Sequence, residues 1–254
     1  MIRRLVLIAL TLAACAAPIT PMPTSAPTVD VDPITLVTLG DSLTEGDKDN
    51  SSDGGGWPRR IRSALAAQRP GSQVVNLARA GWTSTDLLRG ANGEPNQLDR
   101  AVDTLRRASG ATAATIWIGT NDLFYLYEFG HPTVEDERAD RDRFIANLDE
   151  TLQKLGETGA KLFVAQIGDP TTWGAPTGGL FYSTTPDEWS RLSKQAAAYD
   201  AAIQLLAVKH NATVVDVHAT RVFHTPALMD IDGIHPNARG YDALAELWLT
   251  ALSR

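Results

Sequence analysis

Residues 34–46, ITLVTLGDSLTEG, join a run of β-branched and apolar residues to a serine that stands between two glycines. The run from Ile34 to Leu39 predicts a buried strand. Gly40 and Gly46 predict turns at the end of that strand. The stretch therefore predicts a strand that brings the Ser42 hydroxyl to the carboxyl end of a sheet.

Four further runs rich in β-branched residues follow along the chain. They are Gln73–Leu77, Ala114–Ile118, Lys161–Ile167 and Thr213–Val217. Helical patterns separate them, and strands that alternate with helices indicate βα units around a parallel sheet. We therefore expect an α/β fold with five parallel strands, in one domain that spans residues 34–254.

Helical spacing is clearest in the second half of the chain. The segments that show it are the one marked by Phe144, Leu148, Leu152 and Leu155, then Lys194–His210, then Tyr241–Leu252. The charged stretch Glu135–Arg143 leads into the first of these helices, and we expect it to be a solvated face.

Two stretches predict loops with an unusual content of aromatic residues. Residues 121–132 hold Phe124, Tyr125, Tyr127 and Phe129, and residues 168–186 hold Trp173, Phe181 and Tyr182. Both follow predicted strands, at the sheet edge where open α/β folds place their ligands. The aromatic side chains either line a substrate pocket or pack against the domain's own helices, and the sequence leaves both alternatives open.

The composition fits a globular domain that does not bind nucleic acid. Of the 254 residues, 43% are hydrophobic and 21% are charged. The formal net charge of −7 opposes binding to phosphates, which requires a surplus of Lys and Arg. The single cysteine, Cys15, excludes an intramolecular disulfide and a zinc site built from paired thiolates.

The N-terminal segment predicts export. Met1–Arg4 carries two arginines, and the apolar run Leu5–Ala14 is too short to span a bilayer, which is typical of a secretory signal peptide. Leu12-Ala13-Ala14-Cys15 resembles the lipobox of bacterial lipoproteins, in which the cysteine is lipidated and becomes the mature N-terminus.

We therefore expect a signal peptide at residues 1–14, then a lipidated Cys15 at the start of a tether that extends to residue 33. Prolines and threonines dominate the tether, so it cannot bury enough surface to fold. The expected product is an extracytoplasmic, membrane-anchored lipoprotein. The alternative is an ordinary signal peptide and a secreted protein.

Several common catalytic motifs are missing from the sequence. It has no G-x-S-x-G, no G-x-x-x-x-G-K-[ST], no G-x-G-x-x-G and no H-E-x-x-H. The five histidines lack the spacing of metal ligands, so we do not expect a metal site.

Partners for Ser42 occur near the C-terminus, in the segment DIDGIHPN that spans residues 230–237. A carboxylate three residues before a histidine can orient the imidazole through one ring nitrogen and leave the other for a nucleophile. Asp232 and His235 have this spacing and precede the last predicted helix, so they predict a catalytic pair.

Acyl transfer also needs donors for the oxyanion. Gly81 follows the second predicted strand and Asn121 follows the third, so a backbone N–H and a side-chain amide could both face Ser42. Taken singly, Gly81 is more typical of a turn and Asn121 of a helix cap.

Together the segments that carry Ser42, Gly81, Asn121 and His235 resemble the SGNH hydrolases, also called the GDSL esterase/lipase family, from about residue 37 to 241. In this resemblance Ser42 matches the nucleophile, His235 the base and Asp232 the acid that orients it. Gly81, Asn121 and the Ser42 N–H match the donors of the oxyanion hole.

The resemblance implies a three-layer α/β/α sandwich of flavodoxin-like type around a five-stranded parallel sheet. Asp41 and Asp122 also match the family pattern, and we expect them to shape turns by hydrogen bonding rather than to take a proton. Trp57, in Gly56-Trp57-Pro58, matches a frequent family feature, for which we prefer a role in packing.

The resemblance also implies ester hydrolysis through an acyl-enzyme, without a cofactor. It leaves the substrate open among short acyl esters, acetylated sugars and lipid esters. Two other functions fit the same residues: acyl transfer to glycans, in which an acceptor hydroxyl replaces water, and noncatalytic binding of glycan or lipid.

Overall fold

A parallel sheet of five strands forms the centre of the computed structural model, which describes residues 32–52, 54–174, 181 and 183–253. The strands are β1 (Ile34–Gly40), β2 (Gln73–Asn76), β3 (Ala111–Trp117), β4 (Lys161–Ala165) and β5 (Thr213–Val215), in the spatial order β2-β1-β3-β4-β5. All neighbouring pairs are parallel. The predicted five-stranded parallel sheet is confirmed.

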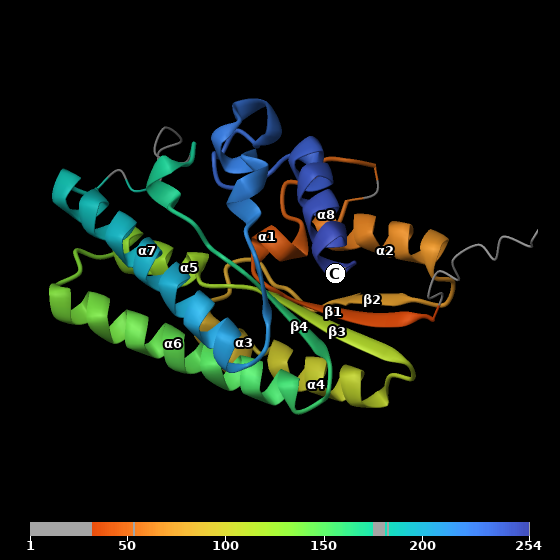
Figure 1. Ribbon diagram of the computed structural model, residues 1–254. Helices are drawn as coiled ribbons and strands as arrows, with labels where there is room; N and C mark the ends of the chain where they lie inside the picture. The colour runs from red at the N-terminus through yellow and green to blue at the C-terminus, as the bar shows by residue number, and fades with distance from the viewer. Residues whose placement is uncertain (1–31, 53, 175–180, 182, 254) are drawn as a thin grey trace, which may run out of the picture. The chain divides into compact units, whose positions relative to one another are not determined.

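Helices cover both faces of the sheet (Figure 1). The helices are α1 (Ser42–Glu45), α2 (Gly56–Gln68), α3 (Ser84–Arg89), α4 (Gln97–Arg107), α5 (Thr120–Glu128), α6 (Val134–Gly156), α7 (Pro186–Lys209) and α8 (Ala238–Leu252). Short 3₁₀ turns occupy Pro170–Thr172, Val217–Thr220, Val222–His224 and Pro226–Leu228. Helices α2 and α8 lie on one face, and α4, α6 and α7 lie on the other, so the three-layer α/β/α sandwich is also confirmed.

Strand β3 begins and ends earlier than its β-branched residues predict. It starts at Ala111, which pairs with Ile34 of β1, and it ends at Trp117. Small alanines give no strand signal of their own, but the register with β1 extends the ladder over them. At the end of β4 the ladder stops because the Asp200 carboxylate, rather than a strand, accepts from the N–H groups of Ile167 and Gly168.

Residues 121–132, predicted as a loop, are mostly helix α5. Its aromatic side chains fulfil both alternatives. Tyr127 packs inside the domain, where it is buried and donates to Glu137. Phe124 lines the same pocket as Ser42 and also packs edge-on against Trp173 and Phe181. Tyr182 and residues 175–180 of the second predicted loop lie outside the described residues.

The charged stretch before residue 144 is not simply a solvated face. It forms the first half of α6, where Glu137 and Asp140 are each only 4% exposed. Glu137 accepts from Tyr127, and Asp140 accepts from Tyr199 and Arg143. The prediction was wrong for these two residues because buried partners from other helices compensate for the loss of hydration.

Trp57 packs as predicted. It is fully buried and stacks on Trp248 of α8, with ring centroids 4.6 Å apart. This contact joins α2 to α8, the helix that follows the His235 segment. Among the described residues, no helix is long and apolar enough to cross a membrane.

Candidate active site

Ser42 begins α1, directly beyond the carboxyl end of β1. The turn that presents it requires glycine at position 40, because a Cβ there would overlap the carbonyl oxygen of Trp117. The buried Gln97 amide holds the same residue from both sides, accepting from Gly40 N at 2.9 Å and donating to Gly40 O at 2.8 Å. The sheet therefore fixes the position of Ser42, which is 8% exposed.

His235 approaches Ser42 from a segment 193 residues away in sequence. Its Nε2 lies 2.8 Å from Ser42 Oγ, and its Nδ1 lies 2.7 Å from Asp232 Oδ2. The other oxygen of Asp232 accepts from the backbone N–H groups of Ile234 and His235, each at 2.9 Å. The three side chains thus form one hydrogen-bonded chain that ends at the serine hydroxyl.

Asp232 remains a carboxylate at neutral pH. Partial burial alone would raise the pKa of Asp232, but the hydrogen bonds from the His235 backbone and ring and from Ile234 lower it overall. An ionised Asp232 fixes the proton of the imidazole on Nδ1, which leaves Nε2 as the acceptor facing Ser42.

Gly81 and Asn121 line the same small pocket as Ser42. Gly81 has φ = 76°, and neither its N–H nor that of Ser42 makes a hydrogen bond to another described residue. Asn121 lies in the first turn of α5 but does not cap it, since its amide donates to Trp82 O at 3.0 Å. The Tyr125 hydroxyl donates to Gly81 O at 2.9 Å, so α5 holds this turn by two contacts.

Asp122 stabilises the segment that follows Gly81 by binding Ser84. Its two oxygens accept from Ser84 N at 2.8 Å and from Ser84 Oγ at 2.6 Å. This is the turn-shaping role expected of Asp122 from the sequence. The pocket encloses about 200 Å³, and its lining residues are Asp41, Ser42, Leu43, Asp47, Ala80, Gly81, Thr120, Asn121, Phe124, Glu128, Ile234 and His235.

The segment that carries these residues matches the model of one known family. The model of the GDSL-like lipase/acylhydrolase family matches residues 38–243. The chain belongs to this family. As a GDSL-like hydrolase, it is a serine enzyme that acts on ester bonds.

Solved structures of similar fold include three such hydrolases. The acetylxylan esterase Axe2 from Geobacillus stearothermophilus has a TM-score of 0.63 at 20% identity, covering 89% of this chain and 97% of that one. The esterase EstA from Pseudoalteromonas sp. has 0.61 at 18%, with 86% and 96% covered. A lipolytic G-D-S-L protein from Veillonella parvula has 0.58 at 16%, with 87% and 99% covered. No curated protein matches the chain.

Asp41 of this GDSL-like hydrolase differs from expectation in one respect. Its Oδ1 accepts from Leu43 N at 3.0 Å and caps α1, as a turn-shaping residue should. Its Oδ2 is buried without a partner among the described residues. Burial, with a smaller contribution from the nearby Asp122, raises the pKa of Asp41 from 3.8 to about 7. Asp41 therefore takes a proton near neutral pH.

Replacing Asp41 with asparagine should stabilise the enzyme in a pH-dependent way. Below pH 3.8 the folded and unfolded parent both carry the proton, and the variant gains nothing. Between pH 3.8 and about 7 only the unfolded chain ionises, so parent stability falls, by up to a few kcal/mol at roughly 1.4 kcal/mol per pKa unit. Asparagine retains an acceptor for Leu43 N and never ionises. We expect equal melting temperatures at pH 3 and a higher one for Asp41→Asn at pH 8. Calorimetry that found a pH-independent difference would contradict this.

Two carboxylates at the pocket of the hydrolase were not predicted from the sequence. Asp47 Oδ2 lies 3.9 Å from His235 Nε2, and Glu128 also lines the pocket. Partial burial raises the pKa of Glu128. Neither residue belongs to a motif, so only the folded chain reveals them. No Lys or Arg is among the described residues that line this pocket.

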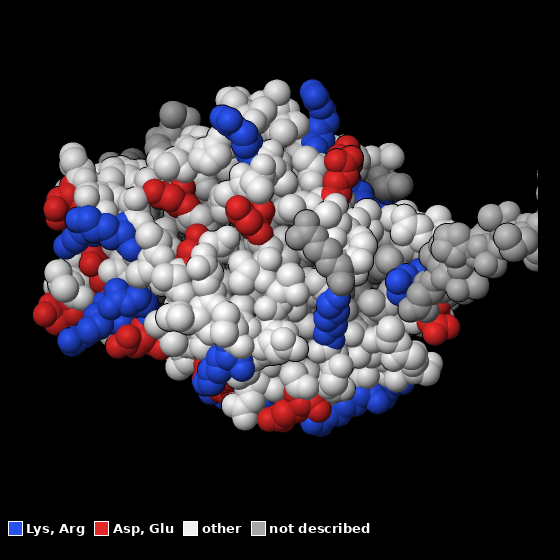
Figure 2. All heavy atoms as spheres, viewed as in Figure 1, with Lys and Arg blue, Asp and Glu red and all other residues white. Residues whose placement is uncertain are grey.

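Metal ligands are not grouped in the part of the chain that the structure describes. Within those residues no three His, Cys, Asp or Glu side chains lie close enough together to hold an ion. The surface in Figure 2 carries basic and acidic side chains interspersed, without a continuous basic area over the described residues of that face.

Proposed function

We propose that this GDSL-like hydrolase cleaves short-acyl esters with Ser42 as nucleophile, His235 as general base and Asp232 as the residue that orients His235. The observation that carries the proposal is the unbroken chain of hydrogen bonds from Asp232 through His235 to Ser42 Oγ, at 2.7 and 2.8 Å, beside a pocket. This is the arrangement that activates a serine hydroxyl.

The proposed reaction has two steps. In the first, His235 Nε2 takes the proton of Ser42 Oγ, which attacks the carbonyl carbon, and the carbonyl electron pair moves to oxygen. When this intermediate collapses, the bond to the alcohol breaks and His235 returns the proton to the departing oxygen. In the second, a water molecule gives a proton to His235 and attacks the acyl carbon. The bond from that carbon to Ser42 Oγ then breaks, Oγ takes the proton back from His235, and the acid leaves.

The developing oxyanion would be held by the N–H groups of Ser42 and Gly81 and by the Asn121 amide. An asparagine amide has two N–H donors, and Trp82 O occupies one of them, which fixes the side chain. The second donor remains for the substrate. Donors fixed before the reaction cost no reorganisation when charge develops.

A short acyl group fits the pocket best. Its volume of about 200 Å³ is below the roughly 300–1,000 Å³ of typical ligand sites, and Phe124 closes one side. The name of the Geobacillus stearothermophilus neighbour, an acetylxylan esterase, agrees with an acetyl group in this family fold.

The test of this function is covalent labelling. A p-nitrophenyl phosphonate should release one p-nitrophenol per chain and leave the phosphonyl group on Ser42, as found by peptide mass spectrometry. A chain that hydrolyses acetyl esters but is labelled elsewhere would contradict the assignment of Ser42. A chain that binds glycans and neither reacts nor hydrolyses would be a binding module.

The negative charge of Asp47 should favour esters of cationic alcohols over esters of neutral ones. Two unit charges about 4 Å apart interact by about 1 kcal/mol in water, which is about a fivefold effect on rate. Lys48, 3.7 Å from Asp47, offsets part of it. We expect Asp47→Asn to lower the ratio of kcat/KM for acetylcholine to kcat/KM for its uncharged isostere 3,3-dimethylbutyl acetate by about three- to fivefold.

Any effect of Asp47→Asn that is the same for both esters divides out of this ratio of kcat/KM values. Asp103→Asn makes the same change of charge on α4, where Asp103 pairs with Arg107, and should leave the ratio unaltered. An unchanged ratio in Asp47→Asn would show that Asp47 does not select substrates by charge.

We also propose that the enzyme is exported and anchored by a lipid on Cys15. Cys15, the signal peptide and the tether to residue 31 lie outside the described residues, so the support is the lipobox-like sequence alone. Cys15→Ser should move the protein from the membrane fraction to the soluble fraction and remove the lipid mass from its N-terminal peptide. Unchanged membrane association and mass would disprove the anchor.

A further inference from the structure

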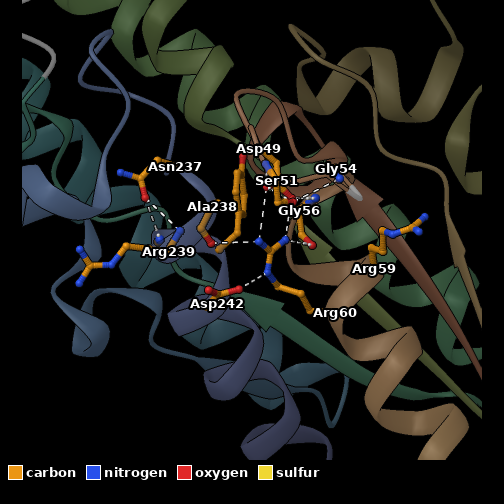
Figure 3. Close-up of polar contacts among 12 residues, drawn as sticks. Asp49, Ser51, Gly54, Gly56, Arg59, Arg60, Asn237, Ala238, Arg239 and Asp242 are labelled. Atoms are coloured by element: carbon orange, nitrogen blue, oxygen red, sulfur yellow. Dashed lines mark hydrogen bonds and ion pairs between the residues drawn. The ribbon is translucent and has the colours of Figure 1, made fainter.

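Arg60 of α2 lies outside the pocket but organises the loop that follows Ser42 (Figure 3). Its Nη1 donates to Asp49 Oδ2 at 2.6 Å and to Gly56 O at 3.0 Å. The Asp49 side chain is fully buried and also accepts from Gly56 N at 2.9 Å and from Ser51 Oγ at 2.8 Å. One guanidinium and one carboxylate therefore close the loop between α1 and α2.

Arg60 and Asp49 form an ion pair at neutral pH. Burial alone would raise the pKa of Asp49, but the hydrogen bonds from Arg60 and Ser51 lower it overall. Asp49 is therefore ionised at neutral pH, and Arg60 carries its charge throughout.

The same guanidinium binds the beginning of α8, as the dashed lines in Figure 3 show. Its Nη2 donates to Ala238 O at 3.0 Å, and its Nε donates to Asp242. Ala238 is the first residue of α8 and lies three positions after His235. A second contact runs in parallel, from the Tyr241 hydroxyl to the carbonyl of Asp47 at 2.8 Å.

His235 needs support from outside its own segment because no strand positions it. Within the segment, Asp230 N donates to His235 O at 2.8 Å and Met229 pairs with Pro236, which fixes the local turn but does not join it to the Ser42 loop. The sheet ends at Val215, and the chain then passes through 3₁₀ turns before α8 begins. By contrast, Ser42 is held at the end of β1. The distance between Nε2 and Oγ thus depends on how the start of α8 is fixed to the Ser42 loop, and a displacement of about 1 Å in a catalytic group can cost 10²-fold in rate.

We propose that Arg60 is a positioning residue that holds His235 within hydrogen-bond distance of Ser42 by joining the loop after Ser42 to the first turn of α8. The proposal rests on the proposed roles of Ser42 and His235. Arg60 touches neither the substrate pocket nor the reacting atoms, so its effect should pass entirely through the geometry of the pair.

The test compares Arg60→Gln with Arg62→Gln on the same helix. Arg62 is exposed and donates to Val74 O at 2.8 Å, away from the loop and from α8. We expect Arg60→Gln to lower kcat about tenfold, to change KM less than twofold, and to slow phosphonate labelling of Ser42 by the same tenfold. Arg62→Gln should keep the parent values. A merely structural role would lower the melting temperature of Arg60→Gln without slowing the labelling of its folded fraction, and that result would overturn the proposal.

Asp242→Ala decides between the outcomes if Arg60→Gln does not fold. The Asp242 side chain is 63% exposed, so its truncation leaves the core intact while removing one acceptor of Arg60 on α8. A kcat two- to threefold lower, with the same fall in labelling rate, supports the proposal, and parent values overturn it. If the parent itself is not labelled at Ser42, the proposed function fails and the positioning role fails with it. A labelled parent with a fully active Arg60→Gln removes the positioning role alone.

Discussion

Replacing Ser42 with alanine is expected to lower turnover of p-nitrophenyl acetate by roughly 10⁵- to 10⁶-fold, because the proposed acyl-enzyme forms on Ser42 Oγ. The substitution removes one oxygen from a side chain that is 8% exposed and that makes its side-chain hydrogen bond with His235. Stability should therefore change by no more than about 1 kcal/mol. Stopped-flow kinetics on protein of matched thermal stability measures the effect, and labelling by the phosphonate should disappear with it.

Ser63→Ala is the matched control for this substitution. Ser63 is an exposed residue of α2 whose hydroxyl donates to the carbonyl of Arg59. It should keep parent turnover and parent labelling. A Ser42→Ala enzyme that retained more than about a hundredth of parent turnover would exclude Ser42 as the nucleophile.

Removal of the Asn121 amide should give the second largest effect. Its free N–H donor gains strength as negative charge develops on the carbonyl oxygen, so Asn121→Ala should lower kcat by roughly 10²- to 10³-fold and leave KM little changed. The hydrogen bond to Trp82 O is lost as well, which should cost about 1 kcal/mol of stability. Steady-state kinetics and thermal melting of the same preparation separate the two effects.

Asn96→Ala is the control that distinguishes this role from helix capping. Asn96 is a true N-cap, since its Oδ1 accepts from Asp99 N at 2.7 Å at the start of α4. Its loss should cost about 1 kcal/mol of stability and leave kcat intact. Equal kinetic behaviour of the Asn121 and Asn96 variants would remove Asn121 from the oxyanion hole.

Aspartate at position 121 should disturb the fold as well as the reaction. If Asn121 capped α5, aspartate would replace it without loss of stability. Because the amide donates to Trp82 O, a carboxylate in its place would face a carbonyl oxygen. Asn121→Asp is therefore expected to lose both turnover and thermal stability, and a variant as stable as the parent would contradict the observed contact.

Much of the fold was predictable from the sequence because its signals are local. Runs of β-branched residues marked all five strands, and alternation with helical patterns marked the parallel sheet. Helix starts were less well predicted: α7 begins at Pro186 rather than Lys194, since Thr185 and Glu188 form a capping box before the apolar periodicity begins.

The sequence by itself determined which side chains arrive at the carboxyl edge of the sheet. Ser42 follows β1, Gly81 follows β2 and Asn121 follows β3, and the carboxyl ends of parallel strands must share one edge. The spacing of Asp232 and His235 was also sufficient to predict their mutual hydrogen bond, because residues three apart in a tight turn face each other. These are properties of short segments and of chain direction.

Only the tertiary structure decided what surrounds those side chains. The proton on Asp41 follows from its complete burial, the carboxylate of Asp47 beside His235 follows from the path of a loop, and the contact between Arg60 and Ala238 joins residues 178 apart. Burial and through-space electrostatics depend on every neighbouring element at once, and no periodicity or spacing within a segment encodes them. For this hydrolase, chain order determined which groups meet, and packing decided their charge states and their exact alignment.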